Sequence, residues 1–200
     1  MELSDPYAER VRYPRQGESA LTVAITGHTS GIGQALTAAL QRRGDRVIGM
    51  SRANGFDITD VGPIVAAAQD ADVFICNAHA AFSQTHLVYE MARLWADKPR
   101  RLVIAMSSLS ADGINPTQGR YAIYKKSLDA ACTQLQADSK VKCRLTLMRF
   151  GYTDTPRIAH RQVRKMSAGE VITHALYAID QPEGHCLLRM DFRAHYEVPI

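Results

Sequence analysis

The stretch AITGHTSGIGQAL, residues 24–36, decides the fold that we expect for this chain. It leads from an apolar, β-branched run at 21–26 into a segment at 31–44 whose apolar residues have helical spacing. The turn between them carries three glycines, Gly27, Gly31 and Gly33. A strand that enters a helix through such a turn presents unpaired N–H groups to an anion, and glycine lets a phosphate approach closely because it has no Cβ. The sequence therefore predicts a phosphate-binding turn, although glycine turns also simply connect strands to helices.

Apolar runs alternate with segments of helical spacing along the rest of the chain. The strands that we expect lie at 21–26, 46–51, 72–78, 101–108, 143–150 and 185–192. The expected helices lie at 31–44, 60–69, 84–96, 119–137 and 167–179. This alternation predicts a parallel sheet covered on both faces, and the strand runs are apolar throughout, as double burial requires. We therefore expect an α/β protein with a Rossmann-type, doubly wound, mostly parallel sheet, which binds its ligand at the carboxyl ends of the strands.

Length and composition favour one domain of ordinary globular character. Residues 1–19 are polar and predict an N-terminal arm outside a single domain at 20–200. We find no apolar run that could span a membrane and no secretory signal, so we expect no membrane partner. The four cysteines lack metal-ligand spacing, which predicts reduced thiols in a cytoplasmic protein and no metal site. The net charge of +4 is mild and no basic stripe is interleaved with aromatics, so we expect no nucleic-acid partner.

The glycine spacing differs from the G-x-G-x-x-G fingerprint and lacks the lysine of a P-loop. TGHTSGIG (26–33) instead resembles the TGxxxGxG turn of the short-chain dehydrogenase/reductase family, which binds NAD(P). Further segments resemble the family's motifs in the family's order: CNAHA (76–80) its NNAG strand end, SSLSADG (107–113) its serine segment, YAIYK (121–125) its YxxxK, and RFGYTDT (149–155) its PG motif. The resemblance runs from about Leu21 to Phe192, and the chain is identified as a compact member of the family.

The resemblance implies hydride transfer between a nicotinamide and a small carbonyl or alcohol substrate. Tyr121 and Lys125 are four residues apart and share a helix face, so a neighbouring ammonium and a cationic nicotinamide would favour the phenolate and make Tyr121 a general acid/base. Lys125 would also hold the nicotinamide ribose, and Ser108 would bond the substrate oxygen. Ser107 and Ser110 compete with Ser108 for that position. A tyrosine and a lysine at this spacing also occur on solvated helix faces.

The residues after the second strand bear on the cofactor. Ser51 and Arg52 stand where a carboxylate would bond the ribose of NAD, and an arginine accommodates a 2′-phosphate, so we expect NADP(H) in preference to NAD(H). A solvated Arg52 is the alternative. Asp57 matches the family's position facing the adenine, with a turn acid as its alternative. The cofactor-binding residues that the resemblance implies are Gly27, Thr29, Ser30, Gly31, Ile32, Gly33, Ser51, Arg52, Asp57, Ile58, Asn77, Ala78, Tyr121, Lys125, Gly151, Thr153 and Thr155.

The sequence departs from the family in its middle. The helix that usually follows the second strand is absent or reduced to a turn after Arg52. The compressed segment that follows Asn77 lacks the asparagine that helps to relay protons in the family, with Gln84, His86 and Ser83 as candidates to replace it through water. The family often builds its tetramer from this helix, and its shortening weakens the transfer of that assembly, so a homo-oligomer, either dimer or tetramer, is left as an open expectation.

Other departures concern the substrate side. His79 replaces the glycine of the NNAG motif and either restricts the cavity, contacts a ligand or is a satisfied loop histidine; Phe150 replaces the proline of the PG motif. A short substrate lid is expected at about 153–168. Four cations in it have helical spacing, which favours either an anionic substrate or a solvated helix face: Arg157, Arg161, Arg164 and Lys165.

These patterns together predict an NADP(H)-dependent oxidoreductase. The alternative is a dinucleotide-binding sensor or partner subunit with impaired catalysis. The intact serine, tyrosine and lysine favour the enzyme, and the missing asparagine favours the alternative.

Overall fold

The structure is a computed structural model that describes residues 20–113, 119–182 and 184–194. The predicted N-terminal arm lies outside these residues. The elements in chain order are β1 (Thr22–Thr26), α1 (Gly31–Arg42), β2 (Arg46–Met50), η1 (Arg52–Asn54), α2 (Val61–Ala68), β3 (Val73–Cys76), α3 (Ser83–Leu94), β4 (Leu102–Ser108), η2 (Leu109–Ala111), α4 (Gly119–Ala137), β5 (Arg144–Phe150), η4 (Pro156–Ile158), α5 (Ala168–Ile179) and β6 (Arg189–Phe192). None of the helices in the described part is long and apolar enough to cross a membrane.

The six strands form one sheet in the order β2-β1-β3-β4-β5-β6, and neighbouring strands run parallel. The chain first builds outward from β1 to β2 and then returns to the other side of β1 with β3. Such a reversal opens a crevice at the carboxyl ends of the two strands beside it. The predicted doubly wound α/β fold is confirmed, and the reversal places the glycine turn after β1 at this crevice.

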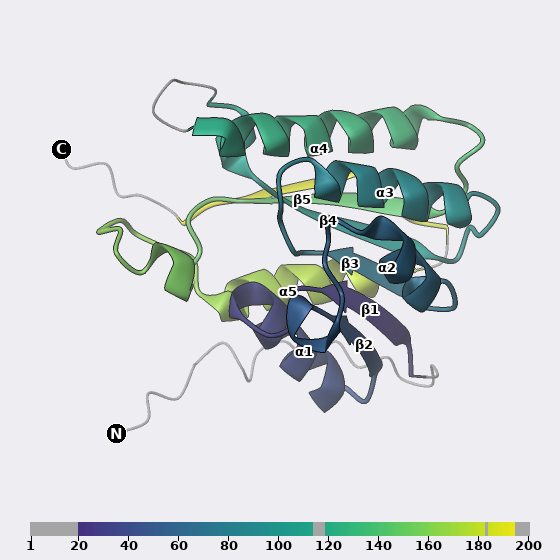
Figure 1. Cartoon of the computed structure of the whole chain (residues 1–200), viewed down its shortest axis with the longest axis horizontal. Coiled ribbons are helices and arrows are strands. Elements are labelled where there is room, and N and C mark those ends of the chain that lie inside the picture. Colours follow the sequence, from purple (N-terminus) through teal and green to yellow (C-terminus); the bar gives the residue numbers. More distant parts are fainter. Residues whose placement is uncertain (1–19, 114–118, 183, 195–200) are drawn as a thin grey trace.

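Helices cover both faces of the sheet (Figure 1). One core layer joins the sheet to α2, α3 and α4, and the other joins it to α1 and α5. The central strands β3 and β4 are buried along nearly their whole length, which is why their sequences are apolar throughout. The outer strands are more exposed, as expected at sheet edges: β6 alternates between exposed and partly buried residues, and in β2 only Met50 is buried.

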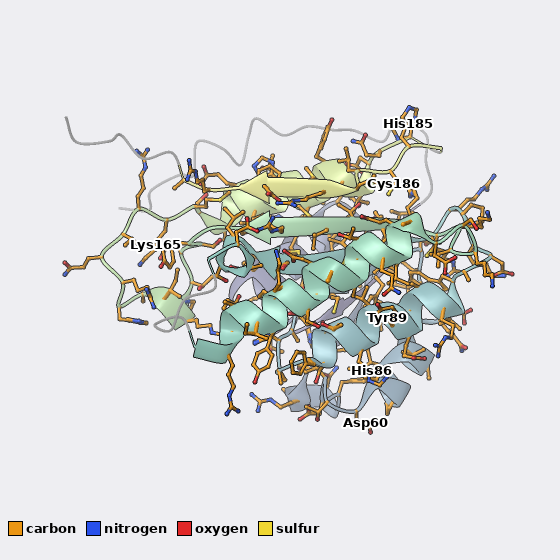
Figure 2. The ribbon with its side chains drawn as sticks, turned by 90° about the horizontal axis from the view of Figure 1, so that it is seen from above. Asp60, His86, Tyr89, Lys165, His185 and Cys186 are labelled. Carbon is orange, nitrogen blue, oxygen red and sulfur yellow. The ribbon has the colours of Figure 1, made fainter. Side chains whose placement is uncertain are left out.

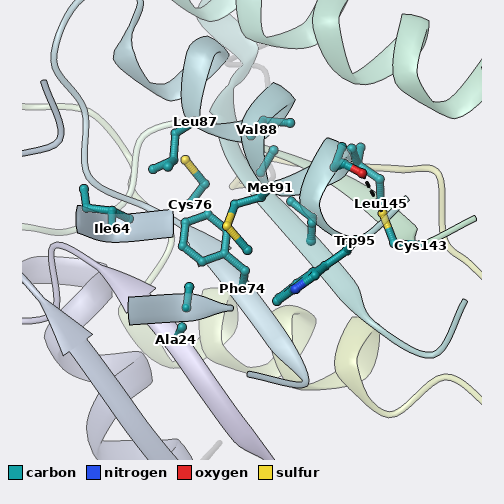
Figure 3. Close-up of a cluster of buried hydrophobic side chains, with 14 of the residues drawn as sticks. Ala24, Ile64, Phe74, Cys76, Leu87, Val88, Met91, Trp95, Cys143 and Leu145 are labelled. Carbon is teal, nitrogen blue, oxygen red and sulfur yellow. Dashed lines mark hydrogen bonds between the residues drawn. The ribbon is translucent and has the colours of Figure 1, made fainter. Parts of the chain in front are cut away.

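The core layer under α3 packs around a tryptophan (Figure 3). Phe74 of β3 packs with Met91 and Trp95 in this core cluster, and all three side chains are buried. The indole Nε1 of Trp95 donates to the carbonyl oxygen of Gln69 at 3.1 Å. Burying each of these side chains stabilises the fold by about 1.5–3 kcal/mol. The cluster fixes α3 against the sheet and thereby fixes the start of α3, which enters the site described below.

Two segments differ in extent from the sequence-based expectation. The last strand begins at Arg189 rather than at 185. Just before it, the amide Nε2 of Gln136 donates to Leu145 O (2.9 Å) and Leu188 O (2.6 Å). The cationic segment after β5 is helical only over Pro156–Ile158, so the predicted helical row of four cations is wrong. The reduction of the helix after β2 to one turn, Arg52–Asn54, is confirmed.

Candidate active site

A cavity of about 1470 Å³ lies at the carboxyl ends of the strands. Its walls include the last residues of four strands: Thr26, Met50, Ser108 and Phe150. Ligand pockets usually measure ~300–1,000 Å³, so this cavity has room for a dinucleotide together with a small second molecule. Every residue that we predicted for the site lines it except Gly33.

The glycine turn forms the wall beside β1. Gly27 and Gly31 adopt φ of +73° and +52°, which side chains with a Cβ rarely adopt, and the N–H of Gly27 donates to Met50 O at 2.7 Å. Ser30 caps α1 without a side-chain hydrogen bond to the helix, so the first-turn N–H groups remain available to an anion.

Gly33 lies behind the turn rather than in the cavity wall, which corrects its predicted role as a contact of the cofactor. A Cβ built on Gly33 would lie 2.1 Å from the carbonyl oxygen of Gly27 and 2.6 Å from Nδ2 of Asn77. The glycine therefore permits close packing of α1 on the end of β1. Gly33 therefore affects ligand binding through the shape of the glycine turn, which this close packing sets.

Asn77 joins the ends of β1 and β3. The backbone N–H groups of Asn77 and Ala78 both donate to Oγ1 of Thr26 at 3.0 Å, and Asn77 Nδ2 donates to the carbonyl oxygen of Thr26 at 3.0 Å. These bonds fix the ends of β1 and β3 relative to each other, and Asn77 and Ala78 line the cavity wall there.

The turn after β2 presents an exposed arginine to the cavity. Asn54 accepts the N–H of Ser51 at 2.8 Å and donates to Gly49 O at 2.8 Å, so the turn is fixed by its own side chains. Arg52 lines the cavity, and among the described residues none forms an ion pair with it. Asp57 accepts two hydrogen bonds from Thr59, which lower the pKa of its carboxyl group. Asp57 is thus a turn acid that also lines the cavity.

Ser108 and Tyr121 meet inside the cavity. The hydroxyl of Ser108 accepts from the hydroxyl of Ser110 at 2.8 Å and from its N–H at 3.2 Å. Ser107 instead donates to Oδ1 of Asp129 at 2.5 Å, on the buried side of β4. The three competing serines therefore have different positions: Ser108 faces Tyr121, Ser110 supports it, and Ser107 is engaged elsewhere.

The ionisation of Tyr121 in the free protein is dominated by burial. Burial raises the pKa of its phenol above the ordinary value of 10, and this effect exceeds the lowering by the Ser108 hydroxyl and by the charge of Arg157. Near neutral pH Tyr121 is a protonated hydrogen-bond donor. The expected phenolate depends also on a bound cationic nicotinamide and stays a prediction for the complex.

Lys125 is buried and held by α3. Its Nζ donates to Oε1 of Gln84 at 2.6 Å and to Met106 O at 2.8 Å, and lies 5.6 Å from the ring centroid of Tyr121. Gln84 is itself buried and donates to Cys76 O at 2.9 Å. Of the three candidates for the relay position, Gln84 thus contacts Lys125 directly and without an intervening water. His86 has an exposed side chain, 3.8 Å from Glu90 (Figure 2).

The burial of Lys125 gives a pH-dependent prediction. Burial lowers its pKa from 10.5 to about 8, so between these values the unfolded chain binds more protons and stability rises with pH. We expect the free energy of unfolding of the wild type to rise relative to that of Lys125→Met by about 3 kcal/mol from about pH 7 to about pH 11. Urea unfolding of both proteins across this range measures the difference, in which the other titrating groups cancel. A constant difference would show that the ammonium is well solvated in the folded protein.

His79 fills the space beside the tyrosine. Its ring makes a T-shaped contact with Tyr121 at a centroid distance of 5.0 Å, and a tilted contact with Tyr124 at 5.9 Å. Burial, with the charges of Lys125 and Arg157, lowers the pKa of His79 to about 4, so the ring is neutral at physiological pH. Its Nδ1 is buried and has no hydrogen-bond partner among the described residues, while the side chain of Gln84 hydrogen-bonds the imidazole and raises its pKa slightly against these effects.

The segment after β5 completes the wall. Gly151 donates its N–H to Phe192 O at 2.8 Å, and a Cβ on Gly151 would lie 3.1 Å from Cβ of Arg193. Thr153 is buried, and its hydroxyl has no partner in the described part of the chain. A buried hydroxyl without a partner in a cavity wall is a group that a bound polar ligand would satisfy. Thr155 lies against Gly31, which connects this segment to the glycine turn.

Comparison with known proteins adds to this geometry. No family model matches the sequence, and the comparison with curated proteins also finds no match. Solved structures do match over most of the chain. A short-chain dehydrogenase from Streptomyces avermitilis has a TM-score of 0.70 at 17% identity, covering 87% of this chain and 89% of that chain. The chain has the fold of the short-chain dehydrogenases/reductases.

Two further neighbours of this short-chain dehydrogenase/reductase fold were solved with a dinucleotide bound. A short-chain dehydrogenase from Burkholderia cenocepacia in complex with NADP has a TM-score of 0.69 at 18% identity and covers 88% of this chain and 89% of that chain. A 3-ketoacyl-(acyl-carrier-protein) reductase from Brucella melitensis complexed with NADH has a TM-score of 0.73 at 16% identity, covering 86% and 96%.

The residues of this chain fit a nicotinamide dinucleotide. The uncapped start of α1 and the glycines before it suit a pyrophosphate, and the unpartnered Thr153 hydroxyl suits a carboxamide. Arg193 is a cavity residue that the sequence analysis missed. Only the pairing of β6 with β5 brings it there, so no local pattern marks it.

Proposed function

We propose that this chain is a short-chain dehydrogenase/reductase that transfers a hydride between NADP(H) and a small carbonyl or alcohol substrate, with Tyr121 as general acid/base. The observation that carries the proposal is that Ser108, Tyr121 and Lys125 lie in one cavity with the glycine turn, although different elements supply them. The 3-ketoacyl-(acyl-carrier-protein) reductase among the structural neighbours acts on a ketone, which supports a carbonyl substrate.

Each side chain of the site has a role in the proposed reaction that follows from its position. The bound cofactor supplies or accepts the hydride. Ser108 accepts from Ser110, which leaves its own proton free to donate to the substrate oxygen. Tyr121 is protonated near neutral pH, which is the form that donates a proton to a carbonyl oxygen during reduction. Lys125 has two of its three protons engaged by Gln84 and Met106, so one remains for the cavity and a ribose hydroxyl.

Arg52 supports NADP(H) over NAD(H), since a guanidinium is a good partner for a 2′-phosphate. We expect Arg52→Ala to weaken NADPH binding by about 10–100-fold, as loss of a charge-assisted hydrogen bond should, and to leave NADH binding unchanged. Titration of the protein with each nucleotide, followed by nicotinamide fluorescence, measures both constants. Arg46→Ala is the matched control, because Arg46 is exposed at the other end of β2. An equal loss for both nucleotides would contradict a 2′-phosphate contact.

We propose that the protein acts in the cytoplasm, and the state of its cysteines supports this. Cys76, Cys132 and Cys143 are buried and Cys186 is partly buried, and all four are free thiols. Free thiols persist in reducing compartments.

NADPH consumption with a panel of small aldehydes and ketones tests the activity, with the alcohol product identified by mass. Turnover that requires NADPH supports the proposal. NADPH binding without turnover of any compound would favour the alternative of a dinucleotide-binding sensor or partner subunit.

A further inference from the structure

The charges that line the cavity are unbalanced. Five cationic side chains line it: Arg52, Lys125, Arg157, Arg161 and Arg193. Asp57 is the single carboxylate among the lining residues that the structure describes, and it lies near Arg52 at the end of β2. The other end of the cavity, around Tyr121, therefore has cations without an acidic partner in its described wall. A cavity lined by one sign of charge attracts ligands of the opposite sign.

Arg157 contacts the ring of Tyr121, as Lys125 does. Its guanidinium carbon lies 5.6 Å from the ring centroid of Tyr121. No ion pair of Arg157 is found among the described residues, and its charge lowers the pKa of Tyr121, His79 and Lys125. The turn Pro156–Ile158 fixes the backbone of Arg157, with Ile158 N donating to Thr155 O at 3.1 Å.

The other lid cations divide between cavity and solvent. Arg161 lines the cavity and is oriented by Tyr152, whose hydroxyl accepts from Nη1 at 3.2 Å and whose ring lies 5.5 Å from the guanidinium carbon. Lys165 lies 3.7 Å from Asp154 on the loop that precedes α5 (Figure 2). Arg164 is exposed and does not line the cavity. Two arginines are thus held at the substrate end, while the remaining cations face elsewhere.

On the basis of the proposed function, we infer that the substrate is a small 2-oxo or 3-oxo acid, or the corresponding hydroxy acid, whose carboxylate binds Arg157. Because Arg157 stands over the ring that carries the reactive hydroxyl, the carboxylate must lie within a few bonds of the carbonyl group. In reduction, NADPH gives a hydride to the carbonyl carbon, the C=O π bond breaks, and Tyr121 gives its proton to the oxygen. The products are the hydroxy acid and NADP⁺, and solvent restores the proton of Tyr121. Arg161 adds a second positive charge that attracts the acid.

The test measures binding of unreducible analogues to the complex of the full chain with NADPH. Oxamate and malonamate are amides that imitate 2-oxo and 3-oxo acids, and oxamide and malonamide are their uncharged counterparts. We expect at least one of the two acids to quench the nicotinamide fluorescence saturably and to bind at least about 10-fold more tightly than its uncharged counterpart.

Substitution of Arg157 tests whether this side chain binds the carboxylate of the acid or a phosphate of NADPH. We expect Arg157→Met to weaken binding of that acid by at least about 10-fold and to leave NADPH and the uncharged amide unchanged. Arg164→Met, in the same loop but outside the cavity, should change none of these constants. Equal affinity for the acids and the amides would overturn the inference. Weaker NADPH binding by Arg157→Met would also overturn it, because Arg157 would then contact a cofactor phosphate. Failure of the wild type to bind NADPH would instead reject the proposed function itself.

Discussion

Replacement of Tyr121 by phenylalanine is expected to lower kcat by about 10²–10⁴-fold, the range for loss of a positioned general acid. The phenol is partly buried beside Ser108 and His79, and its raised pKa keeps the proton available for transfer to a carbonyl oxygen. Phenylalanine keeps the ring and its packing, so NADPH binding should stay within a few-fold of the wild type. Steady-state kinetics with a reducible substrate and a fluorescence titration with NADPH measure the two effects separately.

Tyr124→Phe is the matched control for this substitution. Tyr124 lies on the same helix, and its ring contacts Phe82 and His79, but Tyr124 does not line the cavity. Its replacement should leave kcat within a few-fold of the wild type. Equal activity of the wild type and the Tyr121 variant would show that another group delivers the proton, and the assignment of Tyr121 would be wrong.

Replacement of Gly33 by alanine is expected to lower the free energy of unfolding by about 3 kcal/mol, at the upper end of the range for overpacking. The new Cβ would lie 2.1 Å from the carbonyl oxygen of Gly27, which is backbone and cannot rotate away. Relief requires the glycine turn to move, so NADPH binding should weaken by at least about 10-fold, a loss of about 1.4 kcal/mol. Urea unfolding and nicotinamide fluorescence measure the two changes.

Gly62→Ala is the control for the added methyl group. Gly62 lies in the first turn of α2, where the nearest atom to a new Cβ outside the adjacent residues and the helix backbone is Oδ1 of Asp60 at 3.9 Å. Because Pro63 follows Gly62 and disfavours a helical residue with a Cβ before it, alanine should bring no gain from helix propensity here, and this variant should stay within about 1 kcal/mol of the wild type and bind NADPH normally. If Gly33→Ala behaved in the same way, the close packing of α1 on β1 would be refuted.

Local sequence patterns predicted the order of the elements well. The run at 119–137 matches α4 residue for residue, and the central strands were recognisable because burial on both faces makes their sequences apolar throughout. The glycine turn was equally predictable, since only a few residues between a strand and a helix define it. These features depend on neighbours in the sequence.

Features that depend on distant contacts were not predictable. Gln84 and Lys125 are 41 residues apart, and only the packing of α3 beside α4 brings them together. Gln136 donates to the carbonyl oxygen of Leu188, 52 residues further along the chain, just before the last strand. The pKa of Tyr121 depends on burial, and burial follows from the assembled cavity wall rather than from the YxxxK spacing.

The lid shows why charge spacing alone misleads. The spacing of its four cations predicted one helical face, but the helix ends after Ile158. Arg157 and Arg161 then reach the cavity through contacts with Tyr121 and Tyr152, which no periodicity in the segment describes.

Titration of the purified wild-type protein with NADPH, followed by nicotinamide fluorescence, tests the central claim most directly. The account predicts a saturable change with one nucleotide bound per chain, reversed by excess NADP⁺ and weaker with NADH. Absence of any saturable change with either nucleotide at millimolar concentration would contradict the claim that this cavity binds a nicotinamide dinucleotide.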